Sequence, residues 1–218
     1  MDTSSVPERY TGGTLQPAPD LILASASPRR RELLMSLGLT LAVEPVDIDE
    51  AVRAGEPVRD YATRMAAEKG EAALARLGSP KLAVLAADTV VSLANQILGK
   101  PADEVEAAAM LGTLAGHRHE VLTAYRICFG EQRVERLVST QVSFRSLDAK
   151  EVAAYLASGE WQGKAGAYAI QGIAGAFVTD VRGSFTNVVG LPLAEVLADL
   201  RALQALPGYP PTAFGVLH

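Results

Sequence analysis

The sequence predicts an α/β fold with a mixed β-sheet, and three observations support this prediction. Segments with apolar residues at helical spacing alternate along the chain with short apolar runs typical of buried strands. Two long strand-like segments follow each other directly, which favours an antiparallel pair. The hydrophobic fraction of 49% and the charged fraction of 21% are ordinary for a soluble globular protein that buries a sizeable core.

Capping and helix-breaking residues delimit the elements in the first half of the chain. The segment 21–24 reads as a buried strand. Ser27 fits the N-cap and Pro28 the first turn of a helix, which ends before Gly38. The same patterns predict, in order, a strand and an acidic loop within 41–50, an amphipathic helix over 57–77, a buried strand over 81–93 with Asp88 near its end, a turn at 94–96 and a helix over 102–114.

The second half contains a predicted hairpin, a glycine-rich region and two helices. Residues 119–129 and 133–144 read as two long strands joined by a short turn at 130–132. A capped helix is predicted over 148–158 and a final helix over 192–203. The stretch 159–190 between them is rich in glycine, which predicts a functional loop with one strand at 175–181.

We expect a single domain over residues 21–206, preceded by a flexible extension at 1–20 and followed by an irregular tail at 207–218. The first 20 residues contain acidic residues and prolines but no apolar segment of a secretory signal. No apolar stretch approaches the ~20 residues that a membrane-spanning helix needs. The single cysteine, Cys128, excludes an internal disulfide. These observations predict a cytoplasmic protein with no membrane partner.

Three consecutive arginines open the first predicted helix, where the helix dipole disfavours cations. The free N–H groups of a helix N-terminus bind phosphate well. Donors and charge would be added there by Ser25, Ser27, Arg29 and Arg30. A serine cap with solvated arginines explains the pattern about equally well. The net charge of −5, from 20 basic and 25 acidic residues, argues against nucleic acid as a partner, so any phosphate recognition is local.

Two acidic positions are candidates for catalysis or metal binding. Asp88 lies among apolar residues, so its carboxylate must be paired, protonated, or bound to a metal or a water. A turn cap beside Thr89 is the alternative interpretation of Asp88. Glu50 ends an acidic loop whose simplest interpretation is a solvated one. Held together, Glu50 and Asp88 are suited to Mg²⁺, which prefers oxygen ligands and bridges phosphates.

Three lysines and one histidine occupy compact settings. Lys100 precedes a proline and Lys164 lies in a glycine-rich stretch, where the backbone can approach a ligand closely. Lys69 fits the exposed face of a helix, and His119 reads as a structural histidine. The sequence contains no P-loop, GxSxG or HExxH motif, so those three chemistries lack support.

Eight segments resemble, in the order in which they occur, the Maf family of nucleotide pyrophosphatases: LILASASPRRRELL, DIDE, AAEKGEAA, AADTVV, LGKP, AGHRHEVLTA, GKAGAYAIQG and NVVGLPL. Each segment alone is weak evidence for the family, but the eight together span most of the chain and make the resemblance specific. The resemblance implies a two-lobed α/β fold similar to the inosine triphosphate pyrophosphatases, with the active site in the central cleft between the lobes. It also implies hydrolysis of a nucleoside triphosphate to its monophosphate and pyrophosphate with Mg²⁺ or Mn²⁺.

The functional positions of the family fall on residues of these segments. The resemblance implies that Asp88 is the base that activates water and that Glu50 and Asp88 bind the metal. We expect Arg31 to point outward. From the resemblance and from the pattern itself, substrate contacts are expected at Ser25, Ser27, Arg29, Arg30, Lys69, Lys100 and Lys164.

Three positions resemble the subgroup that hydrolyses dTTP and UTP, namely Arg29, Thr89 and Gln171. The subgroup that acts on 7-methyl-GTP has Trp, Gln and Glu at the corresponding places. A glutamine amide both donates and accepts, as the edge of thymine or uracil requires. We therefore expect a dTTP/UTP pyrophosphatase, which is a hydrolase of phosphorus anhydrides.

The chain departs from the family pattern within its glycine-rich stretch. Gly163 replaces the usual aspartate, Trp161 a common proline and Ala169 a glycine. The missing aspartate would leave Lys164 freer. Ala169 would restrict a backbone position that is expected to need a positive φ.

Several alternatives remain open at this level. They are broad or purine preference, release of single phosphates, and a nucleotide-binding regulator of septum formation with weak catalysis. Asp88, Glu50 and Lys100 argue against the regulator, because a binding protein needs no water-activating acid. The family includes homodimers, and a homodimer is an open expectation for this chain.

Overall fold

The structure is a computed structural model that describes residues 18–207 and 209. The extension expected at 1–20 lies outside the described residues except for its last three. The tail expected at 207–218 lies outside them except for Pro207 and Tyr209. Over the part that is described, no helix combines the length and the apolar character needed to cross a membrane.

The described residues form a seven-stranded mixed sheet flanked by α-helices, which confirms the predicted fold class. The strands are β1 Leu21–Leu23, β2 Leu41–Val43, β3 Val84–Leu93, β4 Gln96–Leu98, β5 Arg118–Phe129, β6 Gln132–Phe144 and β7 Val178–Arg182. The α-helices are α1 Pro28–Met35, α2 Val58–Leu77, α3 Glu104–Leu114, α4 Ala149–Ala157, α5 Phe185–Val189 and α6 Leu193–Ala202, and the 3₁₀ helices are η1 Ala165–Ala167 and η2 Ile173–Phe177.

The strand order is β2-β1-β3-β5-β6-β7, with β4 paired to β3. Strand β1 runs parallel to β2 and β3, whereas the other pairs are antiparallel. One side of β3 pairs continuously with β5. The other side pairs with β1 only at Val84 and Leu85 and with β4 only from Val91 onward. Among the described strands, none therefore pairs with residues 86–90 on that side, and Asp88 lies in the middle of this open edge.

Helices cover both faces of the sheet. Successive residues of a strand point to opposite faces, so β3 contributes apolar side chains to both. On one face, Met65 of α2 belongs to a buried cluster with Val90 of β3. On the other face, Leu34 of α1 and Leu200 of α6 share a cluster with Leu85 of β3. Residues 84, 86 and 90 of β3 thus lie on the face covered by α2, and residues 85 and 87 lie on the face covered by α1 and α6.

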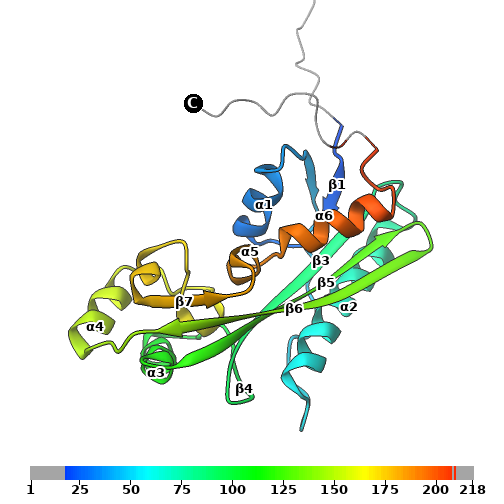
Figure 1. The fold of residues 1–218 in the computed structure, drawn as a ribbon. Helices are drawn as coiled ribbons and strands as arrows, with labels where there is room; N and C mark the ends of the chain where they lie inside the picture. The colour runs from blue at the N-terminus through cyan, green and yellow to red at the C-terminus, as the bar shows by residue number, and fades with distance from the viewer. Residues whose placement is uncertain (1–17, 208, 210–218) are drawn as a thin grey trace, which may run out of the picture.

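A separate hydrophobic core lies at the other end of the sheet. It contains Leu111 of α3, Tyr155 of α4, Phe177 of η2 and Val142 of β6. Figure 1 shows α3, α4 and β7 at one end of the long strands β5 and β6, and α1, α2 and α6 toward the other end. These two groups are the two lobes, and β3, β5 and β6 belong to both.

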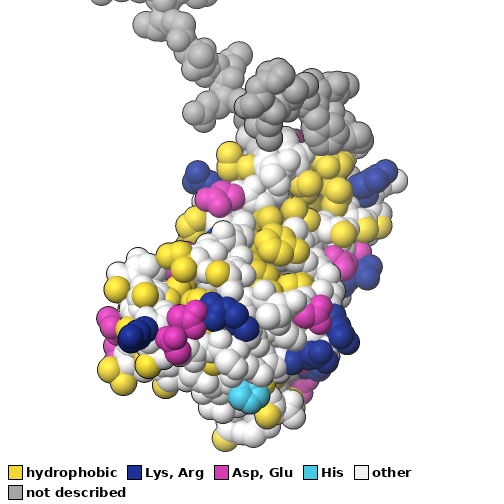
Figure 2. All heavy atoms as spheres, turned by 60° about the vertical axis from the view of Figure 1, so that its left-hand side comes forward, with side chains coloured by type: hydrophobic (Ala, Val, Ile, Leu, Met, Phe, Trp, Pro, Cys, Tyr) yellow, Lys and Arg dark blue, Asp and Glu magenta, His cyan; other side chains and the backbone are white. Residues whose placement is uncertain are grey.

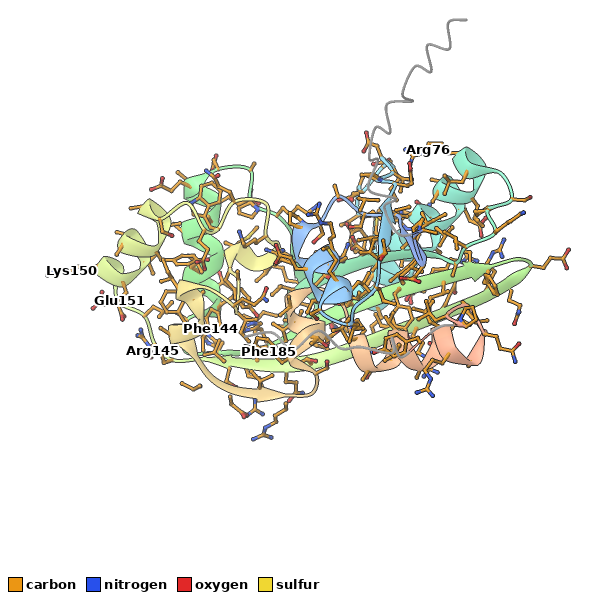
Figure 3. The ribbon with its side chains drawn as sticks, turned by 90° about the horizontal axis from the view of Figure 1, so that it is seen from above. Arg76, Phe144, Arg145, Lys150, Glu151 and Phe185 are labelled. Atoms are coloured by element: carbon orange, nitrogen blue, oxygen red, sulfur yellow. The ribbon has the colours of Figure 1, made fainter. Side chains whose placement is uncertain are left out.

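Most large apolar side chains of the described residues are buried. Figure 2 shows hydrophobic side chains across the upper part of one face, with charged side chains mainly along its edges and below. A few large side chains are about half exposed, among them Met35, Ile173 and Phe185. Figure 3 shows Arg145, Lys150 and Glu151 together at the α4 end of the molecule.

Several details differ from the sequence-based predictions. Asp88 lies in the middle of β3 and not near its end, because β3 begins only at Val84 and its pairing with β5 continues to Ser92. The strand predicted at 175–181 begins only at Val178, since the preceding residues form η2. The turn predicted at 130–132 contains two residues, because Gln132 already pairs with β5. The sequence does not predict β4 or α5, since segments of three and five residues are too short to show periodicity.

Candidate active site

A pocket of about 690 Å³ is lined by residues of both lobes. Five of its lining side chains are basic and two are acidic, in a chain whose net charge is −5. Arg31 does not line the pocket and is exposed, as predicted. Every site residue predicted from the sequence lines it: Ser25, Ser27, Arg29, Arg30, Glu50, Lys69, Asp88, Thr89, Lys100, Lys164 and Gln171.

Two carboxylates converge on one ammonium group at the open edge of β3. Lys69 Nζ lies 2.7 Å from Asp88 Oδ1 and 2.6 Å from Glu50 Oε1. The alternation of β3 explains the first contact, because Asp88 lies on the face covered by α2, which carries Lys69. Lys69 is buried rather than on the exposed helix face that its spacing favours. A buried lysine between two acids is paired, which offsets the cost of removing its charge from water.

The backbone around Glu50 is held by two side chains from the first turns of α2. Tyr61 donates its hydroxyl hydrogen bond to the carbonyl of Glu50 at 3.0 Å. Arg64 Nη2 donates to the carbonyl of Ala51 at 3.0 Å. Burial and the charges of Asp88 and Glu50 raise the pKa of Tyr61 to about 12, so the phenol stays protonated and remains a donor. The acidic loop is therefore fixed where it meets the pocket.

The Glu50 carboxylate is kept ionised by its neighbours. Burial alone would raise its pKa, but the hydrogen bond from Lys69 and the charges of Lys69 and Lys100 outweigh burial and lower it. Lys100 Nζ lies 3.6 Å from Glu50 Oε2 and is largely exposed. Lys69 is thus the closer of the two cations and the only buried one.

The N-terminus of α1 faces the pocket with two hydroxyl groups. Ser27 is the N-cap, and its Oγ accepts from the backbone N–H of Arg30 at 3.5 Å. Ser25 Oγ accepts from the backbone N–H of Ser27 at 3.2 Å. Both hydroxyl oxygens act as acceptors in these contacts, so both keep a proton to donate to a ligand.

Arg30 is tied to the protein through most of its donors. Its Nε donates to the carbonyl of Gly190 at 2.8 Å, and Nη1 donates to Ser25 Oγ at 3.1 Å and to the carbonyl of Ala87 at 2.8 Å. Nη2 donates to Thr89 Oγ1 at 3.0 Å. A guanidinium has five N–H groups, so one remains for a ligand. Arg30 therefore supplies a fixed charge more than a set of free donors.

Arg29 and Lys164 carry charges that the protein does not pair directly. Within the described chain Arg29 makes no ion pair, and Lys164 Nζ donates only to the carbonyl of Gln162, at 3.3 Å. Burial lowers the pKa of Arg29 and also that of Lys164, and the charge of Arg29 lowers the pKa of Lys164 further. The two cations come from opposite lobes and repel each other across the pocket. An anion between them would remove this repulsion.

The segment that carries Gln171 is held by an acid from the same lobe. Glu160 Oε2 accepts from the backbone N–H of Ile173 at 3.0 Å. Its other oxygen accepts from the N–H of Ala174 at 3.5 Å. Gln171 itself is exposed at the rim of the pocket, so its amide is accessible to a ligand.

Two residues that bear on the site lie in the segments that resemble the family but are not among the predicted site residues. Thr123 of β5 lies opposite Thr89 in the β3–β5 register, and the two Oγ1 atoms are 2.9 Å apart. Asn187 of α5 accepts at its carbonyl from Thr123 Oγ1 at 3.0 Å. The register of β3 and β5 is what could have identified Thr123, because it pairs Thr123 with Thr89, 34 residues away in the chain. Ser184 before α5 and Gly190 after it are the capping residues that point to this short helix.

The sequence model of the Maf-like protein family matches residues 20–203. The chain belongs to this family. It is 55% identical over 190 residues to the dTTP/UTP pyrophosphatase of Cereibacter sphaeroides, covering 87% of this chain and 97% of that protein. It is 52% identical over 190 residues to the dTTP/UTP pyrophosphatase of Anaeromyxobacter dehalogenans strain 2CP-1, covering 84% and 94%. Among solved structures it is similar to a HAM1 protein from Coxiella burnetii, with 16% identity and a TM-score of 0.44 over 84% of this chain and 98% of that chain.

One expectation about the departures of this Maf-like protein is wrong. Ala169 was expected to restrict a position with positive φ, but φ is not positive there. The left-handed positions nearest to it are Gly166, with φ of 66°, and Ala167, with φ of 60°. The backbone turns at η1, before Ala169, because η1 packs directly against Val91 of β3. Gly163 has φ of 67°, which suits a glycine.

His119 of this Maf-like protein is a structural residue, as the sequence predicts. It is 2% exposed and does not line the pocket. Its Nε2 shares a hydrogen bond of 2.9 Å with the hydroxyl of Tyr168. Burial lowers the pKa of His119 to about 4, so the ring is neutral at pH 7. The neutral ring supports Tyr168, which lines the pocket, and does not itself line it.

Proposed function

We propose that the protein hydrolyses dTTP and UTP to the nucleoside monophosphate and pyrophosphate. The observation that carries this proposal is the pocket in which Asp88 and Glu50 share Lys69 beside four further cations. Such a site accepts a strongly anionic substrate next to a carboxylate that can take a proton. The names of the relatives that are about half identical to this chain support the same reaction.

Asp88 is the proposed general base. Its Oδ1 accepts from Lys69, while Oδ2 has no hydrogen-bond partner among the described residues and is available to a water molecule. Asp88 takes a proton from this water as the water oxygen bonds to the α-phosphorus. The bond from the α-phosphorus to the bridging oxygen breaks, and pyrophosphate leaves with its electron pair. The water oxygen ends in the monophosphate.

Glu50 and Asp88 are the proposed ligands of a divalent cation, Mg²⁺ or Mn²⁺. No cluster of three or more His, Cys, Asp or Glu side chains suited to a metal occurs in the described ranges. Two carboxylates still fit such an ion, because Mg²⁺ is commonly held by one or two carboxylates with substrate phosphates and water as its other ligands. When bound, the ion supplies charge that offsets the phosphate oxygens.

The basic side chains are proposed to hold the phosphate chain. A triphosphate carries about four negative charges, which cations offset best in a cleft with little water. Ser25 and Ser27 donate from the end of α1, and Arg29 and Lys164 reach the phosphates from opposite lobes. Lys69, Lys100 and the remaining N–H of Arg30 complete the set.

The preference for thymine or uracil is proposed to depend on Arg29, Thr89 and Gln171. Gln171 is suited to contact the base edge directly, because its amide is exposed and both donates and accepts. Thr89 is engaged with Arg30 and Thr123, so its influence acts through Arg30. We further propose that the enzyme is cytoplasmic and forms a homodimer.

The first test is product analysis with dTTP, UTP, CTP, GTP and 7-methyl-GTP in Mg²⁺. We expect monophosphate and pyrophosphate from dTTP and UTP. The change Asp88→Asn keeps the size of the side chain but cannot take a proton from water, so kcat is expected to fall at least about 100-fold.

The control for this test is nucleotide binding by the Asp88→Asn protein, measured by calorimetry. Binding that persists while turnover is lost assigns Asp88 to the chemical step. Release of orthophosphate would contradict the proposed bond cleavage. Binding without turnover by the unmodified protein would favour a nucleotide-binding regulator.

A further inference from the structure

Thr123 is a buried hydroxyl behind the pocket wall. Its side chain is fully buried and does not line the pocket. Thr123 Oγ1 lies 3.0 Å from the carbonyl oxygen of Asn187 and 2.9 Å from Thr89 Oγ1. A carbonyl only accepts, so the one proton of Thr123 is donated to Asn187. Thr123 Oγ1 is then the nearer of two acceptors for the proton of Thr89.

The direction of the Thr89–Thr123 hydrogen bond determines whether Thr89 Oγ1 presents a lone pair or its proton to Arg30. The proton of Thr89 points to Thr123, so a lone pair of Thr89 Oγ1 is free to accept from Arg30 Nη2 at 3.0 Å. The alternative acceptor for Thr89 is the carbonyl of Gly190, which is more distant at 3.3 Å. The result is a chain of hydrogen bonds from Arg30 through Thr89 and Thr123 to Asn187.

We propose that Thr123 is a positioning residue that holds the Arg30 guanidinium in the active site through Thr89. The proposal rests on the proposed function, because the effect of Arg30 on the reaction is what Thr123 controls. Arg30 is 9% exposed and its other donors bind Gly190, Ser25 and Ala87, so a small rotation of the guanidinium would break several contacts together. Asn187 anchors the far end of the chain, since its Nδ2 donates to the carbonyl of Val121 and to Thr140 Oγ1, both at 3.0 Å.

The test compares Thr123→Val with Thr123→Ser. Valine has nearly the shape of threonine and lacks the hydroxyl, whereas serine keeps it. We expect Thr123→Val to lower kcat for dTTP about tenfold with KM changed less than about twofold, because Thr89 loses the acceptor that orients it toward Arg30 while the substrate contacts remain. Thr123→Ser is expected to stay within about threefold of the unmodified protein. Ser92→Ala, at a buried position of the neighbouring strand β3 outside the pocket, is the control and is expected to leave kcat unchanged.

A double-mutant cycle separates positioning from a general structural effect. Lysine has one nitrogen and lacks the planar fork of arginine, so Arg30→Lys cannot keep the Thr89 contact together with the other contacts of Arg30. If Thr123 acts through Arg30, adding Thr123→Val to Arg30→Lys lowers kcat less than about twofold further. A second tenfold fall in the double variant would overturn the proposal, and so would an effect of Thr123→Val no larger than that of Ser92→Ala.

A spectroscopic readout is independent of turnover. The side-chain NMR signals of Arg30, assigned by their loss in Arg30→Lys, are expected to exchange with solvent at least about fivefold faster in Thr123→Val than in Thr123→Ser. Equal exchange in the two variants would overturn the proposal. If the unmodified protein cleaves no nucleotide, the proposed function fails while this measurement still tests the role of Thr123.

Discussion

Lys69 is the residue on which the charge balance of the site depends. It is buried and touches both carboxylates, whereas Lys100 is exposed and lies 3.6 Å from Glu50 alone. Two carboxylates that share a site repel each other when both are ionised, unless a cation lies between them. Lys69 provides this cation before any substrate is bound.

Replacing Lys69 by methionine should therefore shift the pH dependence of activity. The pKa of Glu50 is lowered by Lys69, so removing the ammonium raises this pKa, and Glu50 becomes protonated at a higher pH. The acid limb of the kcat/KM profile is therefore expected to move to higher pH. The profile of Lys100→Met should move less, because that lysine is exposed and more distant. Equal shifts in the two variants, or none, would contradict this account.

The same contact links pH to stability. Because the folded-state pKa of Glu50 is lowered, its contribution to stability is present above the unfolded-state pKa of glutamate and is lost as the pH falls through the folded-state pKa. The ion pair of Glu50 and Lys69 is therefore expected to affect how the free energy of unfolding falls at acidic pH.

Residue roles were only partly predictable from the sequence. The pattern identified Arg30 as a substrate contact, but four of its five N–H groups bind the protein. Those partners lie as far as 160 residues away in the chain. The local sequence indicates that Arg30 lies at the start of a helix. The hydrogen-bond partners of its N–H groups depend instead on where β3 and the end of α5 lie in the fold.

At the scale of elements, the sequence predicts long segments well and short ones poorly. Helices α2, α3, α4 and α6 and strands β3, β5 and β6 carry enough residues for periodicity and capping to be read. Strand β4 and helix α5 are too short for this, and each exists because it packs on a longer neighbour. The glycine-rich segment is predicted as a loop with one strand, but η1, η2 and α5 also form within it, and its left-handed backbone at Gly166 is set by contact with β3.

Gly166 is expected to be sensitive to substitution. It has φ of 66°, and an added Cβ would lie 2.9 Å from Val91 Cγ1 and 3.0 Å from Val91 Cβ. Valine is short and branched, so it cannot move aside. Gly166→Ala should lower the free energy of unfolding by about 3 kcal/mol, from backbone strain and overpacking together. Urea unfolding measures this value.

Gly159→Ala is the matched control for Gly166→Ala. Its φ of 70° is similar, but an added Cβ would meet nothing within 4 Å. Only the strain remains, so the loss is expected to be about 1 kcal/mol. Equal losses in the two variants would show that Val91 does not constrain η1. The double variant Gly166→Ala with Val91→Ala should not recover stability in that case.

At the scale of the whole molecule, charge is distributed unevenly. The chain carries a net charge of −5, yet the pocket has five basic and two acidic side chains. A nucleotide approaching from a distance is repelled by the total charge and attracted by the pocket. At 0.1 M ionic strength the Debye length is about 10 Å, so the pocket decides the final approach.

The salt dependence of kcat/KM tests which field controls association. Screening of a net repulsion would raise kcat/KM as salt increases, whereas screening of a local attraction lowers it. We expect kcat/KM for dTTP to fall several-fold between about 20 and about 200 mM KCl at constant Mg²⁺. Lys164→Met should make this fall shallower, because Lys164 lines the pocket. Lys150→Met changes the net charge equally but lies at the far end on α4 (Figure 3), so its slope should match that of the unmodified protein. If both variants change the slope alike, total charge and not the pocket controls the approach of the substrate.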